Sequence, residues 1–154
     1  MNGFIRPLSH VALLGMLALP TSSLAQDGFS EHARSFIMVC LQHAPGLSEA
    51  AISRSVSQER FNARGSSATA SVAVRDGRSC NLRIGGGETG MTPPSDQETQ
   101  RLALWFAGRV GGNVTRQRSA IGGSIWYKVQ VGRMKYGVEA TLDKGVLSYW
   151  IAKR

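Results

Sequence analysis

The sequence contains 154 residues, of which 42% are apolar and 18% charged, and its 18 Lys and Arg against 10 Asp and Glu give a formal net charge of +8. This length is typical of a single domain, and the composition is too hydrophobic for a disordered polycation, so a packed core is expected. The same length excludes most multi-part cofactor enzymes.

The first 25 residues have the pattern of a secretory signal peptide. Arg6 supplies the positive charge, an apolar run covers residues 11–19, and small residues lie on both sides of the leucine in residues 23–25. The apolar run is shorter than the roughly 20 residues that span a bilayer, so no transmembrane anchor is expected. Cleavage at this point would leave residues 26–154 as one exported domain, periplasmic or secreted. Removing Arg6 leaves 17 basic residues against 10 acidic ones, and the exported domain is therefore still basic.

Residues 30–44 carry apolar side chains at three-and-four spacing, which predicts the first helix. Cys40 falls on its apolar stripe, and Cys80 is the only other cysteine. Two cysteines in an exported chain predict a disulfide, and a reactive thiol is disfavoured because there is no CxxC motif. Closing the loop between them would contribute about 4 kcal/mol in the chain-entropy account.

The next segments predict a short surface helix over residues 48–60, followed by a β-hairpin. Residues 68–74 and 80–84 alternate between apolar and polar side chains, and Asp76-Gly77 lies between them as a tight turn. Cys80 shares the apolar face of its strand, so the disulfide would pin the first helix onto the sheet.

A third helix is predicted from a capping box at Ser95 and Glu98 to a glycine pair after Val110. We interpret residues 111–123, bounded by glycine pairs, as a loop that could carry function. Three strands then follow in a meander. They cover residues 125–131, 134–142 and 146–151.

The facing of the last strand depends on the turn that precedes it. A three-residue loop would point Trp150 inward, whereas a two- or four-residue loop would point Leu147, Tyr149 and Ile151 inward and Trp150 outward.

The order of elements is ααββαβββ, with strands joined by short turns. This order predicts an α+β domain with an antiparallel sheet of about five strands, helices packed on one face, and one disulfide.

Few residues support catalysis. Residues 85–90 match the spacing GxGxxG, but they follow a hairpin strand and a proline pair separates them from the next helix, so they are interpreted as a loop. His32 and His43 lie too far apart on the predicted helix to share a metal. No GxSxG, HExxH or SxxK motif occurs. We therefore expect no catalytic residue, metal or cofactor.

The basic residues are the main positive feature of the sequence. If the apolar strand faces point inward, one outer sheet face carries cations together with an exposed tryptophan, and the predicted loop adds two arginines. The candidate binding residues are Arg75, Arg83, Lys128, Lys135, Trp126, Arg116 and Arg118. Interleaved arginines and aromatics can hold phosphate, carboxylate or stacked rings. The plain alternative is a solvated face that keeps the protein soluble.

These observations favour a small exported binding or accessory protein of the cell envelope, which docks on an anionic protein or polymer through a basic sheet face and loop. Nucleic acid is disfavoured as a partner because no nucleic-acid-binding signature occurs. One alternative is a small secreted hydrolase with a dispersed site drawn from Glu139, Asp143 and His43. Another is a chaperone-like envelope subunit with an apolar patch around Trp126 and Trp150.

Overall fold

The computed structural model describes residues 28–58, 69–85 and 91–154. The predicted signal peptide and most of the glycine-rich segment at 85–90 lie outside these residues. None of the helices in the described ranges is long and apolar enough to cross a membrane.

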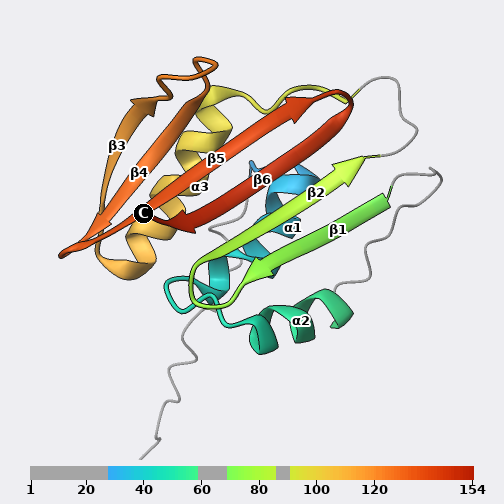
Figure 1. Cartoon of the computed structure of the whole chain (residues 1–154), viewed down its shortest axis with the longest axis horizontal. Coiled ribbons are helices and arrows are strands. Elements are labelled where there is room, and N and C mark those ends of the chain that lie inside the picture. Colours follow the sequence, from blue (N-terminus) through green and yellow to red (C-terminus); the bar gives the residue numbers. More distant parts are fainter. Residues whose placement is uncertain (1–27, 59–68, 86–90) are drawn as a thin grey trace, which may run out of the picture.

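The domain is α+β and is built on one antiparallel sheet of six strands in the order β1-β2-β6-β5-β4-β3 (Figure 1). The strands are β1 (Thr69–Arg75), β2 (Ser79–Gly85), β3 (Asn113–Arg118), β4 (Ile125–Val131), β5 (Met134–Asp143) and β6 (Val146–Lys153). Because β6 pairs with both β2 and β5, it joins the first hairpin to the C-terminal meander.

Three α-helices and one short 3-10 turn complete the described part of the chain. They are α1 (Glu31–Val39), η2 (Leu41–His43), α2 (Glu49–Gln58) and α3 (Asp96–Val110). Helices α1 and α3 lie behind the sheet in Figure 1, and α2 lies next to the β1 edge. Helix α3 packs mainly against β4, and α2 contacts α1 and β1.

The core lies between these helices and one face of the sheet. Alternate residues of every central strand point into it, among them Leu82, Tyr127, Val138 and Ile151, each at most 2% exposed. Aromatic pairs connect the two layers. Phe36 of α1 stacks on Tyr149 of β6, and Phe106 of α3 meets the ring of Tyr136 of β5 edge-on. The predicted inward strand faces are thus confirmed.

The predicted disulfide is also confirmed. Cys40, at the end of α1, is bonded to Cys80 in β2 across a sequence separation of 40, and both residues are fully buried. The bond therefore ties the helical layer to the sheet at the strand that was expected to receive it.

The first helix is shorter than the predicted 30–44. It ends at Val39, and residues 41–43 form the 3-10 turn η2. Ala44 is extended, with ψ 145°, as the residue before a proline usually is, so Pro45 limits how far the helix can continue.

The predicted loop over residues 111–123 is wrong in its first half, because residues 113–118 form the edge strand β3. Only Val114 is apolar there, so the strand pattern is absent from the sequence, and pairing with β4 decides the conformation. Gly112 permits the close approach, since a Cβ at this position would lie 2.9 Å from Val129 Cγ1. The sheet consequently has six strands rather than about five.

The turn between β5 and β6 settles the facing of the last strand. Asp143 pairs with Val146, which leaves the two-residue turn Lys144-Gly145, where both residues have positive φ. This is the geometry of a two-residue hairpin turn. Tyr149 consequently points into the core, and Trp150 points to the opposite face of the sheet.

Candidate functional site: the uncovered sheet face

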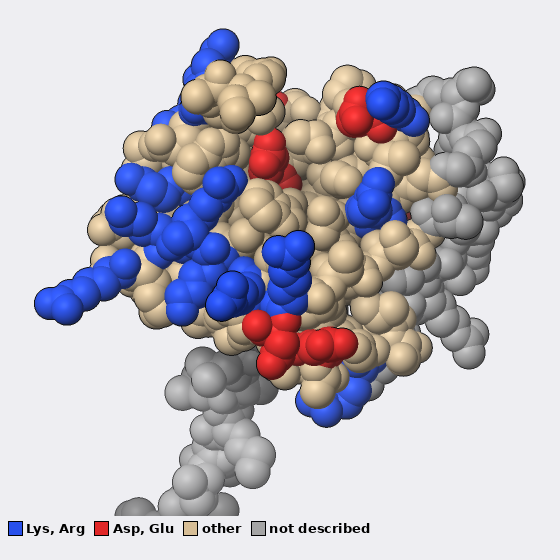
Figure 2. All heavy atoms as spheres, viewed as in Figure 1, with Lys and Arg blue, Asp and Glu red and all other residues tan. Residues whose placement is uncertain are grey.

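One face of the sheet is not covered by any helix of the described ranges, and we call it the open face. It is the face turned to the viewer in Figures 1 and 2. Strand register and the buried neighbours assign its outward side chains. They include Arg75, Asn81, Arg83, Gln117, Trp126, Lys128, Lys135, Glu139, Asp143 and Trp150, and Arg154 also lies over this face.

Three adjacent strands bring two tryptophans and a carboxylate into one row at the centre of the open face. Trp126 of β4 pairs with Glu139 of β5, and Glu139 pairs with Trp150 of β6. The two tryptophans are therefore two strand spacings apart, roughly 10 Å. Asn81 and Gln117 continue the row on its two sides.

Arg154 lies between the two indole rings. Its guanidinium carbon is 4.6 Å from the ring centroid of Trp126 and 5.1 Å from that of Trp150. Gly137, which lacks a side chain, provides the space, because a Cβ there would lie 3.0 Å from Arg154 Nε. The backbone N–H of Arg154 donates to the Lys135 carbonyl at 2.8 Å, which fixes the end of the chain to β5.

Two of the four candidate cations of the sheet lie beside this arrangement, and two lie farther away. Lys128 pairs with Gly137, over which Arg154 lies, and the Lys135 carbonyl accepts the hydrogen bond from the Arg154 N–H. Arg75 and Arg83 also point outward, but they lie on β1 and β2. Figure 2 shows basic side chains gathered around the β4–β5 turn and the C-terminus, with few acidic ones among them.

Arg116 and Arg118 were expected in a loop that would extend the basic sheet face, but they lie on a strand and do not belong to the open face. They lie on β3 opposite Tyr127 and Ile125, so they point to the helical side of the sheet. Arg116 forms an ion pair with Asp96 at 3.0 Å, and the Tyr127 hydroxyl donates to the same carboxylate at 2.7 Å. These hydrogen bonds lower the pKa of Asp96 and raise that of Arg116. Arg116 therefore holds the start of α3 on the sheet.

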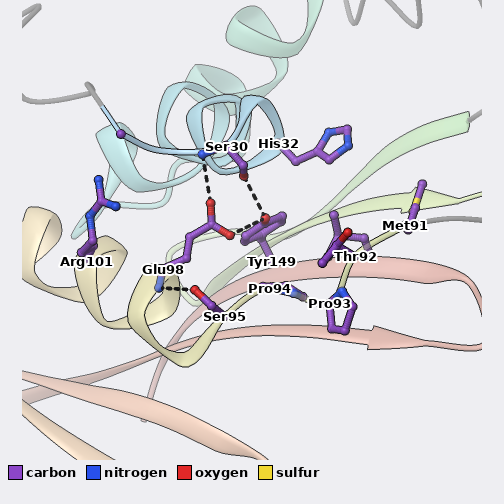
Figure 3. Close-up of a pocket in the computed structure, with 12 residues that line it drawn as sticks. Ser30, His32, Met91, Thr92, Pro93, Pro94, Ser95, Glu98, Arg101 and Tyr149 are labelled. Atoms are coloured by element: carbon purple, nitrogen blue, oxygen red, sulfur yellow. Dashed lines mark hydrogen bonds between the residues drawn. The ribbon is translucent and has the colours of Figure 1, made fainter.

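A cavity of about 510 Å³ opens on the helical side, next to the N-termini of α1 and α3 (Figure 3). The Glu98 carboxylate accepts from the Ser30 N–H at 3.0 Å and from the Tyr149 hydroxyl at 3.4 Å, so it joins the two helices instead of completing a capping box. Burial is the main cause that raises the pKa of Tyr149 to about 12. These polar groups bond mainly to one another and thereby stabilise the fold.

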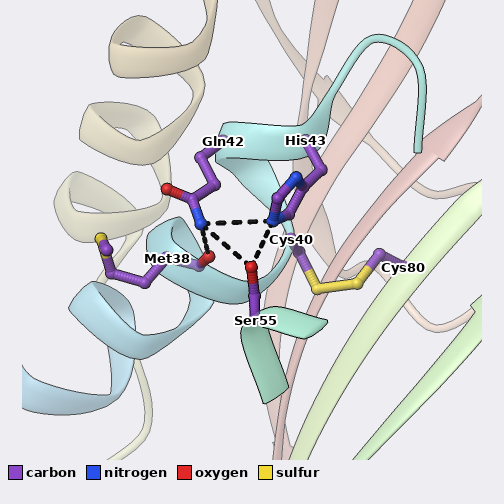
Figure 4. Close-up of a disulfide and its surroundings, with 6 residues drawn as sticks. All are labelled: Met38, Cys40, Gln42, His43, Ser55 and Cys80. Carbon is purple, nitrogen blue, oxygen red and sulfur yellow. Dashed lines mark hydrogen bonds between the residues drawn. A yellow bond between two sulfur atoms is a disulfide. The ribbon is translucent and has the colours of Figure 1, made fainter. Parts of the chain in front are cut away.

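A serine and a histidine meet beside the disulfide (Figure 4). His43 Nε2 lies 2.6 Å from Ser55 Oγ, and Gln42 Nε2 lies 3.2 Å from the same ring nitrogen. A nucleophilic pair would need a third group that orients the base, usually a carboxylate. The charged groups near His43 are instead Arg109 and Arg54. We interpret the contact as packing between η2 and α2.

The three residues proposed for a hydrolytic site, Glu139, Asp143 and His43, do not lie together. Glu139 and Asp143 belong to the open face of β5, whereas His43 lies in the helical layer on the other side of the sheet. Within the described ranges, no group of three His, Cys, Asp or Glu residues could hold a metal.

No protein family, no curated protein and no solved structure matches this chain. Gln117 was expected to lie in a loop, and nothing in the sequence indicated that Arg154 lies on the open face. Arg154 follows the last strand and belongs to no periodic pattern, so only the folded sheet shows that it lies over two tryptophans.

Proposed function

We propose that the protein is a small exported, non-catalytic binding or accessory protein of the cell envelope, which docks on an anionic partner through the open face. The observation that carries this proposal is the charge of that face. Five cations point outward or lie over it, namely Arg75, Arg83, Lys128, Lys135 and Arg154, against two outward carboxylates, Glu139 and Asp143. Arginine and lysine side chains bind carboxylate and phosphate through charge-assisted hydrogen bonds.

The arrangement of charge supports binding better than it supports a solvated face alone. Arg154 is stacked on two aromatic rings, which restricts its side chain before any partner arrives and so reduces the entropy lost on binding. A merely solvating cation needs no such support. The disulfide and the six-stranded sheet keep the face rigid, as a docking surface requires.

A double substitution on the open face tests this proposal. Lys128→Ala with Lys135→Ala should weaken binding to immobilised polygalacturonate and polyglutamate about tenfold, because two charge-assisted contacts are lost. Binding of the unsubstituted chain should also fall as salt is raised from 50 to 500 mM.

The matched control is Arg34→Ala with Arg54→Ala, which removes the same charge from exposed positions of α1 and α2. This control should bind like the unsubstituted chain. Equal losses in the two double variants would show that net charge alone causes retention, and binding that is insensitive to salt would contradict the electrostatic basis.

A further inference from the structure

The centre of the open face combines features that a purely electrostatic surface does not need. Trp126 and Trp150 are both partly exposed, and the carboxylate of Glu139 lies between them in the same row. A carboxylate at the centre of a basic face opposes binding of a simple polyanion, because it repels the ligand's charge. The same carboxylate favours a ligand that also presents hydrogen-bond donors, because it can accept hydrogen bonds from them.

The two indoles form rigid apolar surfaces. Each has the Arg154 guanidinium on one side, at 4.6 and 5.1 Å from the ring centroids, and such stacking restricts the orientation of all three side chains. Rigid aromatic anchors lose little conformational entropy when a ligand binds. They also present flat carbon surfaces that suit a ring with an apolar face.

Polar groups lie on both sides of this platform. Asn81 and Gln117 flank the tryptophans in the same row. Lys128 lies next to Gly137, directly beside the stacked guanidinium. Acceptors in the row and cations beside it would together match a ligand that carries both hydroxyl groups and negative charge.

From this juxtaposition we infer that the open face recognises an anionic polysaccharide, with sugar rings packed against Trp126 and Trp150, hydroxyl groups donating to Glu139, and acidic groups bound by Lys128 and Arg154. The roughly 10 Å between the tryptophans is a span that two linked sugar rings cover. This inference rests on the proposed function and narrows its partner to one class. A DNA strand would bring phosphates and planar bases but few hydroxyl groups for the central carboxylate.

Tryptophan fluorescence can test the inference on the 154-residue chain. Titration with soluble oligogalacturonate should change the emission in a saturable way, and Trp126→Leu should weaken binding at least tenfold. Trp105→Leu is the matched control, because Trp105 also lies under an arginine, with Arg109 at 5.0 Å, but belongs to α3 on the helical side. This control should bind like the unsubstituted chain, and circular dichroism should show that both variants remain folded.

Two comparison ligands complete the experiment. Polyphosphate is a charged chain without rings, and oligo(dT) is a charged chain with planar bases. The inference expects both to bind at least tenfold more weakly than oligogalacturonate of similar charge. Equal binding of polyphosphate, or tighter binding of oligo(dT), would overturn it.

Comparison of Trp126→Leu with the double lysine variant distinguishes the sugar-ring contact from electrostatic docking in general. If Trp126→Leu binds normally while Lys128→Ala with Lys135→Ala binds weakly, the sugar-ring contact is wrong and the electrostatic docking remains. If both variants bind normally, the proposed function is also wrong.

Discussion

At the scale of single residues, His43 shows how its surroundings set the charge of a side chain. Burial, and then the positive charges of Arg109 and Arg54, lower its pKa from the ordinary value of 6.5. The imidazole is therefore neutral in the folded protein near pH 7, and its Nε2 lies within hydrogen-bond distance of Ser55. Protonation would place a third positive charge beside two arginines.

This shift predicts a loss of stability in mild acid. The unfolded chain takes up a proton on His43 near pH 6.5, whereas the folded chain resists protonation until a lower pH, so the free energy of unfolding should decrease as the pH falls below 6.5. An NMR titration of the His43 ring should give a midpoint below 6.5. A midpoint at or above that value would contradict the described environment.

The residues of the candidate site were predictable only in part. Alternation along each strand assigned Arg75, Arg83, Lys128, Lys135 and Trp126 to the outer face, because side chains of a strand alternate strictly between faces. The same rule could not place Trp150, whose direction depends on the length of one turn. It also gave no information on Arg154, because this residue reaches the tryptophans through tertiary structure.

At the scale of elements, hairpins and the capped helix α3 were predictable because their signals are local. The three residues 76–78, which include Asp76-Gly77, join β1 and β2, and Ser95 Oγ accepts from the Glu98 N–H at 3.0 Å, as expected for an N-cap. Strand β3 was missed because its sequence, NVTRQR, has polar residues on both faces. An edge strand is held by one neighbour and needs no apolar alternation of its own.

The Cys40–Cys80 disulfide links the helical layer to the sheet and should contribute to stability. Reduction of the Cys40–Cys80 bond should lower the free energy of unfolding by about 4 kcal/mol, because the unfolded chain regains the freedom of a loop with separation 40. Denaturant unfolding with and without reductant measures the effect. Cys40→Ala with Cys80→Ala should also be destabilised and should not respond to reductant. An unchanged midpoint after complete reduction would contradict the prediction.

At the scale of the whole molecule, the sheet separates two surfaces with different chemistry. On the helical side, two carboxylates have specific partners: Asp96 binds Arg116, and Glu98 joins Ser30 to Tyr149. On the open face, cations outnumber carboxylates and an arginine is stacked between tryptophans. These two carboxylates of the helical side are therefore engaged within the fold, and we propose that the open face binds the partner.

Part of the net charge of +8 lies on the open face, which carries five cations and two carboxylates. The sequence-based surface combined a sheet face with a loop, but Arg116 and Arg118 turn to the other side, so the proposed docking surface is the sheet face alone. It is smaller than expected, and it has the two tryptophans at its centre.

An NMR titration of the uniformly ¹⁵N-labelled chain with oligogalacturonate locates the binding surface. Binding at the open face should shift backbone amides around Trp126, Glu139 and Trp150, and the indole N–H signals of both tryptophans, while amides of α1 and α3 remain in place. Shifts centred on the helical side, around the cavity near Glu98 and Tyr149, would show that the open face is not the binding surface.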